Sequence, residues 1–194
     1  MLCLSGGKMK KLALALLYTA ATVLAIPAHA DVEAAQALRD GDMKKLNFHA
    51  EAKPAGTNAF ESFDGDPLTL EDWQGKWVLV NFWATWCAPC REEMPALAQL
   101  QTDMGGEDFE VVTVAAGRNP KPAMTSFFDE IAVDNLPLHR DPKSALAREM
   151  GVLGLPITVI LNPEGEEVAR LQGDADWASD EARAVIGALI GAGG

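Results

Sequence analysis

The segment 77–104 constrains the fold of this chain most, because it places two cysteines between an apolar run and an amphipathic stretch. Residues 77–83 are almost wholly apolar, and such continuous hydrophobicity predicts a strand that is covered on both faces of a parallel or mixed sheet. Residues 89–104 repeat Met and Leu at spacings of three and four, which predicts a helix. Cys87 and Cys90 stand at the junction, so strand, cysteine pair and helix follow one another directly.

The position of the cysteine pair suits dithiol–disulfide chemistry. The first cysteine is expected at a helix N-terminus, where free backbone N–H groups and the helix dipole favour a thiolate. Two intervening residues bring the second sulfur within bonding distance. We therefore expect Cys87 to be the attacking thiol and Cys90 to resolve the mixed disulfide. Pro89 falls in the first helical turn, where proline loses no hydrogen bond, and it stiffens the loop between the sulfurs.

Other uses of a CxxC pair fit this sequence less well. Haem attachment needs His after the second cysteine, where Arg91 stands. A four-ligand zinc site needs two more ligands, and neither His49 nor His139 lies at metal spacing. A purely structural disulfide between residues so close in sequence closes too small a loop to stabilise much. The context favours redox catalysis, with no metal and no cofactor beyond the cysteines themselves.

The rest of the chain predicts one α/β domain with a central mixed sheet flanked by helices. An Asp-Gly turn between the short apolar stretches 60–63 and 68–70 predicts a hairpin. Further strands are expected at 109–116, 157–161 and 167–171, a short edge segment at 136–138, and helices at 122–132, 141–150 and 180–190.

Residues 1–30 have the three-part pattern of a secretory signal peptide, with a basic patch, an uncharged run and an Ala28-His29-Ala30 cleavage site. The alternative is an uncleaved anchor, although a spanning helix needs about 20 apolar residues. Residues 31–58 are expected to form a flexible arm, or a short helix, followed by a linker, and residues 59–194 the domain. The net charge of −12 disfavours nucleic acid and anionic lipid as partners.

Several segments resemble a known family. The sequence Asn-Phe-Trp-Ala-Thr-Trp-Cys-Ala-Pro-Cys at 81–90 is similar to the active-site segment of thioredoxin-like proteins, and Arg-Glu-Glu-Met-Pro at 91–95 resembles their exported TlpA/ResA branch. Residues 151–158 are similar to the second signature of the family, and 174–179 to TlpA. The resemblance covers roughly 60–190. It implies a thioredoxin fold with an N-terminal β-hairpin and a short helical insertion before a cis-proline.

The resemblance also implies roles for individual residues. Pro156 would be the cis-proline that faces the cysteines, since a cis bond is almost only possible at proline; the alternative is an ordinary turn proline. That geometry would leave the backbone of Leu155 free to pair with a substrate strand, with Ala88 and Pro89 as further substrate contacts. Trp86 is expected to pack beside the sulfurs and to belong to the catalytic set.

Glu93 matches the glutamate that tunes the thiols in ResA-like proteins. It lies three residues after Cys90, on the same face of the predicted helix, where a carboxylate raises the pKa of a thiol and can accept its proton. The alternative is a solvated helix glutamate. Thioredoxin has a buried Asp at the position of Asn81, and because Asn cannot titrate, that route of proton transfer is absent here.

The resemblance implies a periplasmic thiol–disulfide oxidoreductase that reduces client disulfides and acts as a monomer. Its clients would include cytochrome c or copper-site assembly factors, and its electrons would come from a membrane dithiol donor of the CcdA/DsbD type. Ile157 stands after the proline where the family commonly has Thr, and the cytochrome c maturation branch often has Glu. This departure disfavours a dedicated haem-lyase partner.

Three alternative functions are weighed against this reading. A disulfide-introducing oxidase of the DsbA type carries a long helical insertion and a different loop, often with His. A copper-delivery module of the Sco type uses CxxxC and a His, and this chain has neither arrangement. A thiol peroxidase expects Thr or Ser three residues before a lone reactive cysteine, where Ala84 stands.

Overall fold

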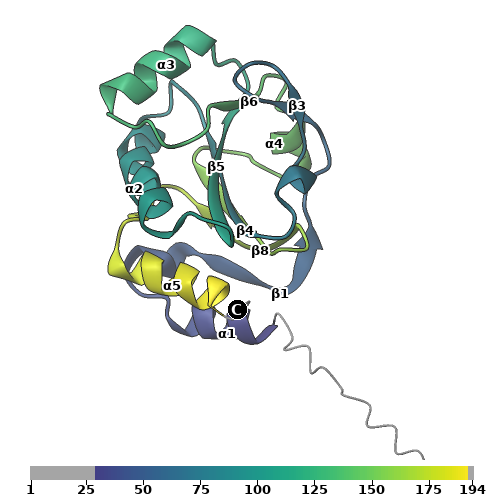
Figure 1. Ribbon diagram of the computed structural model, residues 1–194, viewed down its shortest axis with the longest axis vertical. Coiled ribbons are helices and arrows are strands. Elements are labelled where there is room, and N and C mark those ends of the chain that lie inside the picture. Colours follow the sequence, from purple (N-terminus) through teal and green to yellow (C-terminus); the bar gives the residue numbers. More distant parts are fainter. Residues whose placement is uncertain (1–28, 192–194) are drawn as a thin grey trace, which may run out of the picture.

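A mixed sheet with β4 (Trp77–Trp83) near its centre organises the chain. The computed structural model describes residues 29–191, and within them eight strands pair in the order β1-β8-β7-β4-β5-β6-β2-β3 (Figure 1). The other strands are β1 (Asn47–Pro54), β2 (Phe60–Glu61), β3 (Pro67–Leu68), β5 (Phe109–Ala116), β6 (His139–Asp141), β7 (Ile157–Leu161) and β8 (Glu166–Gln172). The helices are α1 (His29–Ala37), α2 (Ala88–Met104), α3 (Lys121–Glu130), α4 (Ala145–Glu149) and α5 (Asp180–Ile190), with the short 3₁₀ helices η1 (Gly41–Lys45) and η2 (Leu70–Trp73).

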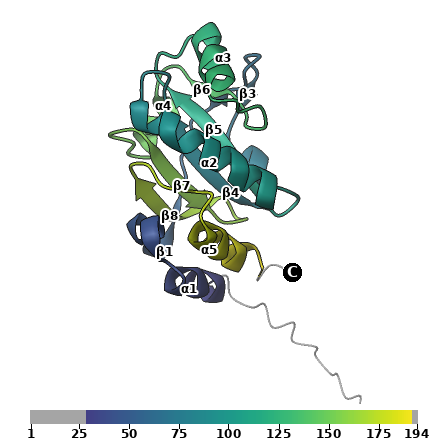
Figure 2. The ribbon, with the colours of Figure 1, turned by 90° about the vertical axis from the view of Figure 1, so that its left-hand side faces the viewer.

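Every residue of β4 is buried, because helices and loops cover both faces of the sheet. β4 pairs in parallel with β5 and antiparallel with β7. Since side chains alternate along a strand, Leu79 and Trp83 enter the core that α2, α3 and α5 cover, while Val80 and Phe82 enter the core on the α4 side. Figure 2 shows α2 lying across the sheet, and α1 packs against α5 beside it. Burial on both faces fixes the strand that leads into the cysteine pair.

The elements predicted from strong local patterns are confirmed. β4, β5, β7 and α5 have the expected bounds, and α2 begins one residue earlier than expected. The hairpin is the β2–β3 pair, in which Phe60 lies opposite Leu68, and Gly65 in its turn has a φ of 107°. The short helix α4 precedes a cis bond between Leu155 and Pro156. The fold is therefore the expected α/β fold with a central mixed sheet.

The short helix expected as one alternative within residues 31–58 is present as part of α1, but the residues after it form η1 and a strand of the sheet in place of a linker. This strand is β1, which pairs antiparallel with β8 along the edge of the sheet. Met43 and Leu46 are fully buried. The sequence pattern misses this because single apolar residues stand between charged ones, so their burial becomes evident only when the sheet is assembled.

Two local expectations after β5 are also wrong. The edge strand is β6 at His139–Asp141 and not 136–138, because Pro137 has no N–H to donate and its carbonyl accepts the Thr113 hydroxyl. The helix expected from residue 141 begins only at Ala145, since Asp141 still belongs to β6. The Asp141 carboxylate nevertheless caps that helix by accepting the N–H groups of Ala145 and Ala147, at 2.8 and 2.9 Å.

The predicted signal peptide lies outside the described residues, apart from its last two residues, which begin α1. Over the part of the chain that the structure describes, no helix is both long enough and apolar enough to cross a membrane.

Candidate active site

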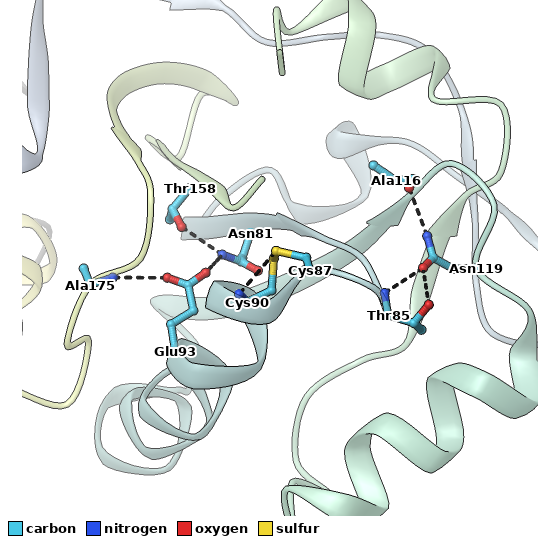
Figure 3. Close-up of a disulfide and its surroundings, with 9 residues drawn as sticks. All are labelled: Asn81, Thr85, Cys87, Cys90, Glu93, Ala116, Asn119, Thr158 and Ala175. Atoms are coloured by element: carbon cyan, nitrogen blue, oxygen red, sulfur yellow. Dashed lines mark hydrogen bonds between the residues drawn. A yellow bond between two sulfur atoms is a disulfide. The ribbon is translucent and has the colours of Figure 1, made fainter. Parts of the chain in front are cut away.

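The cysteine pair lies where β4 leads into α2. Cys87 is the N-cap residue of α2 and is bonded to Cys90 through a disulfide (Figure 3). The Cys90 N–H donates to Cys87 Sγ over 3.3 Å. The first turn of the helix thus presents a backbone donor to the first sulfur, which stabilises negative charge on it when the disulfide opens.

The two sulfurs differ in their access to solvent. Cys87 is 5% exposed, whereas Cys90 is fully buried. Ala88, between them, is exposed and Pro89 is half-buried. Of the two cysteines, Cys87 alone retains exposed surface, which is the asymmetry expected of an attacking and a resolving cysteine.

The Leu155–Pro156 peptide bond is cis, as the resemblance to the family implies. Pro156 is buried, and Leu155 is half-buried against the core cluster that contains both cysteines. Leu153, two residues earlier, is 94% exposed. This loop therefore offers open apolar surface next to a fixed backbone.

Trp86 does not pack beside the sulfurs as expected, because 70% of its surface is exposed. The inward position at the end of β4 is taken by Trp83, whose ring lies 4.7 Å from that of Phe127. Trp77 and Trp83 are core residues, as expected. Trp86 directly precedes Cys87 in the chain, so a large exposed aromatic side chain is adjacent in sequence to the first cysteine.

Glu93 is buried, and among the described residues it forms no ion pair; the nearby cation Lys45 is paired with Asp42. The Glu93 side chain is 2% exposed, accepts the Asn81 Nδ2 amide at 2.8 Å and accepts the Ala175 N–H at 3.3 Å. Burial raises the pKa of Glu93 to about 7, against the lowering effect of these hydrogen bonds. The Trp177 indole also lowers this pKa, although it makes no hydrogen bond of standard geometry. The alternative of a solvated glutamate is therefore wrong.

Asn81 connects Glu93 to the neighbouring strand. It is fully buried on β4, opposite Thr158 of β7. Its Nδ2 group donates to Thr158 Oγ1 at 3.0 Å as well as to Glu93. Both amide protons are therefore used, and the side chain has one fixed orientation.

Asn119 is a site residue that sequence reasoning missed. Its Oδ1 accepts the N–H of Thr85 at 2.8 Å and the Thr85 hydroxyl at 3.1 Å, while its Nδ2 donates to the Ala116 carbonyl at 2.9 Å. These bonds tie the loop before Cys87 to the end of β5 (Figure 3). The available signal was a polar residue directly after a buried strand, but many solvated loops share that pattern.

Neither His49 nor His139 belongs to this site. His49 bonds Glu167 at 2.7 Å, and His139 packs against Phe60 and Trp73. Across residues 29–191 no cluster of three His, Cys, Asp or Glu side chains could hold a metal ion. A cavity of about 370 Å³ lies between α1, β1 and the turn before β8, and no predicted site residue lines it.

Solved structures share this arrangement. A Chlorobium tepidum protein assigned as the thiol:disulfide interchange protein DsbE superposes with a TM-score of 0.62 at 25% identity, over 72% of this chain and 97% of its own. The fold is thus the thioredoxin fold, and its cysteine pair makes this chain a thiol–disulfide oxidoreductase whose redox group is its own disulfide.

The chain belongs to the AhpC/TSA family, whose sequence profile matches residues 47–169. The thiol-disulfide oxidoreductase ResA of Bacillus subtilis (strain 168) is 33% identical over 124 residues, which is 64% of this chain and 68% of ResA. The thioredoxin-like protein YneN of the same organism is 34% identical over 117 residues, 59% of this chain and 67% of YneN. The resemblance to the ResA branch is confirmed.

Proposed function

We propose that this protein reduces disulfide bonds of client proteins in the periplasm, through a mixed disulfide at Cys87 that Cys90 resolves. The difference between the two sulfurs carries the proposal, because Cys87 is accessible and Cys90 is fully buried. The export pattern of residues 1–30 supports the location.

The first step uses the N-terminus of α2. In the dithiol form the Cys87 thiolate is favoured by the helix dipole and by the Cys90 N–H. It attacks one sulfur of the client disulfide, so that a Cys87–client bond forms and the client S–S bond breaks. The other client sulfur leaves as a thiolate.

The second step uses Glu93. The Cys90 thiol gives its proton to the Glu93 carboxylate, and the resulting thiolate attacks Cys87 Sγ. The Cys87–Cys90 bond forms, the bond to the client breaks, and the client sulfur leaves as a second thiolate. Two electrons pass to the client, and the two client thiolates take up the protons. A carboxyl group with a pKa of about 7 suits this exchange.

The client is expected to bind over the open apolar surface beside Cys87. Trp86 and Ala88 are exposed and Pro89 is half-buried, and the backbone of Leu155, held by the cis bond at Pro156, can pair with an extended client segment. Cytochrome c or copper-site assembly factors are the client classes that the TlpA/ResA resemblance suggests. A membrane dithiol donor of the CcdA/DsbD type would regenerate the dithiol, and the protein would act as a monomer.

A glutathione equilibration of the full chain with Cys3→Ala tests the direction of electron flow. A potential at or below about −200 mV supports a reductase, and one near about −120 mV overturns this reading in favour of a disulfide-introducing oxidase. Cys90→Ser should accumulate a mixed disulfide with a client, whereas Cys87→Ser, the matched control, should not. Trapping at Cys90 instead would contradict the assigned roles. Copper bound by the protein at stoichiometric amounts would favour the copper-delivery alternative.

A further inference from the structure

Only the nitrogen of the Asn81 side-chain amide has hydrogen-bond partners among the described residues. Its nitrogen donates to Glu93 and Thr158, whereas its Oδ1 is buried and finds no donor among the described residues. A buried carbonyl oxygen without a partner loses its hydration and gains nothing in return. Such an atom in a closed core can accept a hydrogen bond from a donor that is present only in another redox state of the protein.

The position of Asn81 identifies that donor. Cys90 and Glu93 are three residues apart on α2, and both are buried, so they occupy one face of the helix, one turn apart. Asn81 binds Glu93 through its nitrogen. In Figure 3 its carbonyl oxygen lies on the opposite side, toward the disulfide. The unpartnered oxygen is therefore directed at the turn of α2 that carries Cys90.

Opening of the disulfide changes the count of donors in this core. In the oxidised protein the Cys90 sulfur has no hydrogen to donate. Two-electron reduction by a dithiol breaks the Cys87–Cys90 bond, oxidises the dithiol to a disulfide and transfers two protons to the protein. One of these protons is on Cys90, as an S–H group with no access to water. The reduced protein thus gains one buried donor on the turn of α2 toward which the unpartnered Asn81 Oδ1 is directed.

We propose that Asn81 Oδ1 accepts a hydrogen bond from the Cys90 thiol in the dithiol form. Asn81 then holds Glu93 with its nitrogen and the Cys90 proton with its oxygen, and it keeps that proton on sulfur until the mixed disulfide has formed. This inference rests on the proposed function, since it concerns the dithiol form. An aspartate here would place a second carboxylate beside Glu93, whereas asparagine supplies the same oxygen without charge.

The Cys90 S–H stretching band provides a direct test. In full-length protein with Cys3→Ala and Cys87→Ala, Cys90 is the remaining thiol, and we expect its infrared band at the position of a hydrogen-bonded S–H. Adding Asn81→Leu, which removes the acceptor, should move the band to the higher wavenumber of a free thiol. The matched control Thr158→Val removes a neighbouring partner of Asn81 but not its oxygen, so the band should stay. A band that Asn81→Leu leaves in place overturns the inference.

The dithiol–disulfide equilibrium gives a second readout. With both active-site cysteines present, Asn81→Leu should shift the equilibrium with glutathione about fivefold toward the disulfide, the order of one lost hydrogen bond. A shift toward the dithiol would contradict the inference. The shift caused by Asn81→Leu is also measured in a Glu93→Gln background. This comparison separates the effect of Asn81→Leu on Cys90 from the effect of losing the Asn81–Glu93 hydrogen bond. If the wild type exchanges no disulfide with glutathione, the proposed function fails together with this inference. If the wild type does exchange, but Asn81→Leu leaves the Cys90 S–H band in place, this inference alone fails.

A measurement without any change at residue 81 covers the case in which Asn81→Leu does not fold. The ¹³Cγ resonance of Asn81 should move on reduction of the otherwise unaltered Cys3→Ala protein, in the direction of a carbonyl that gains a hydrogen bond. An unmoved resonance would contradict the proposal.

Discussion

Glu93 and Glu167 are two buried glutamates in opposite electrostatic situations. They are 2% and 3% exposed. Glu93 receives only neutral donors, and burial raises its pKa to about 7. Glu167 is buried too, which alone would raise its pKa, but the Arg170 guanidinium at 2.6 and 2.7 Å and His49 at 2.7 Å outweigh this and lower it.

The difference in their partners gives the two buried carboxylates different roles. Glu167 joins β1 to β8, since His49 belongs to β1 and Arg170 to β8, and its constant charge makes it a structural group. Glu93 forms no ion pair with a described residue, since Lys45 is paired with Asp42, and burial raises its pKa to about 7. It can therefore gain and lose a proton near neutral pH beside the cysteine pair. Burial is common to both, and the partners decide which is reactive.

Removing the cation from Glu167 should have the largest effect on stability. Arg170→Ala leaves a buried carboxylate without its guanidinium, so we expect the free energy of unfolding to fall by about 4 kcal/mol in urea denaturation. Arg183→Ala, which breaks exposed ion pairs with Asp103 and Asp180 and a bond to the Ala178 carbonyl, serves as control and should cost much less, because solvent screens exposed ion pairs. Equal losses in the two variants would contradict the structural role of Glu167.

The pH dependence of stability should separate the two carboxyls. The folded pKa of Glu93 is raised above 4.5, its ordinary value, to about 7, so the protonated form is favoured in the folded state. The contribution of Glu93 to the free energy of unfolding is fully present below about pH 4.5. It is lost as the pH rises through 7, and the loss is about 3 kcal/mol. Urea unfolding of the oxidised wild type should show this loss, and Glu93→Gln should not. A parallel pH profile for both would refute the raised pKa.

Glu167 contributes with the opposite sign. Its folded pKa is lowered, so its stabilisation is present above the unfolded value near 4.5 and is lost as the pH falls through the folded value.

Glu93→Gln should slow disulfide reduction without unfolding the protein. Glutamine fills the same space but cannot take the Cys90 proton, and a general base contributes about a hundredfold or more to rate. Stopped-flow reduction of a client disulfide at pH 7 measures this loss. If Glu93→Gln reduces the client within twofold of the wild-type rate, while Arg170→Ala shows its predicted loss of stability, Glu93 is only a structural residue.

The loop before Cys87 should give a smaller effect. Asn119→Ala leaves the partly buried N–H of Thr85 without its acceptor, at a cost of about 1 kcal/mol, and should slow exchange at Cys87 by loosening the loop that precedes it. Asn135→Ala removes an exposed amide that bonds the Ala98 carbonyl and is the matched control. Hydrogen exchange at Thr85 tests the prediction, and unchanged protection in Asn119→Ala would contradict it.

Local patterns in the sequence predict the core of the fold and the cysteine site, but they do not predict contacts between segments that are distant in the sequence. β4 and α2 carry continuous or periodic apolar residues, and Glu93 follows Cys90 at helical spacing. β1 has no regular alternation of burial, because an edge strand needs only a few buried residues. Trp86 is exposed because Trp83 fills the inward space, and the partnership of Asn119 with Thr85 joins residues 34 positions apart. No local signal encodes either outcome.

The two margins of the sheet discourage self-association. The β1 margin carries Lys53 and Pro54 and shifts register after Phe48, while the β3 margin is only two residues long and begins with Pro67. Charge, proline, irregularity and shortness each make a strand edge a poor template for further strands. Copies of this protein should therefore resist stacking into fibrils even when crowded, and an extended guest chain is directed to the loop beside Cys87. The proposed client surface beside Cys87 is therefore separate from the strand edges at which copies of this protein could pair.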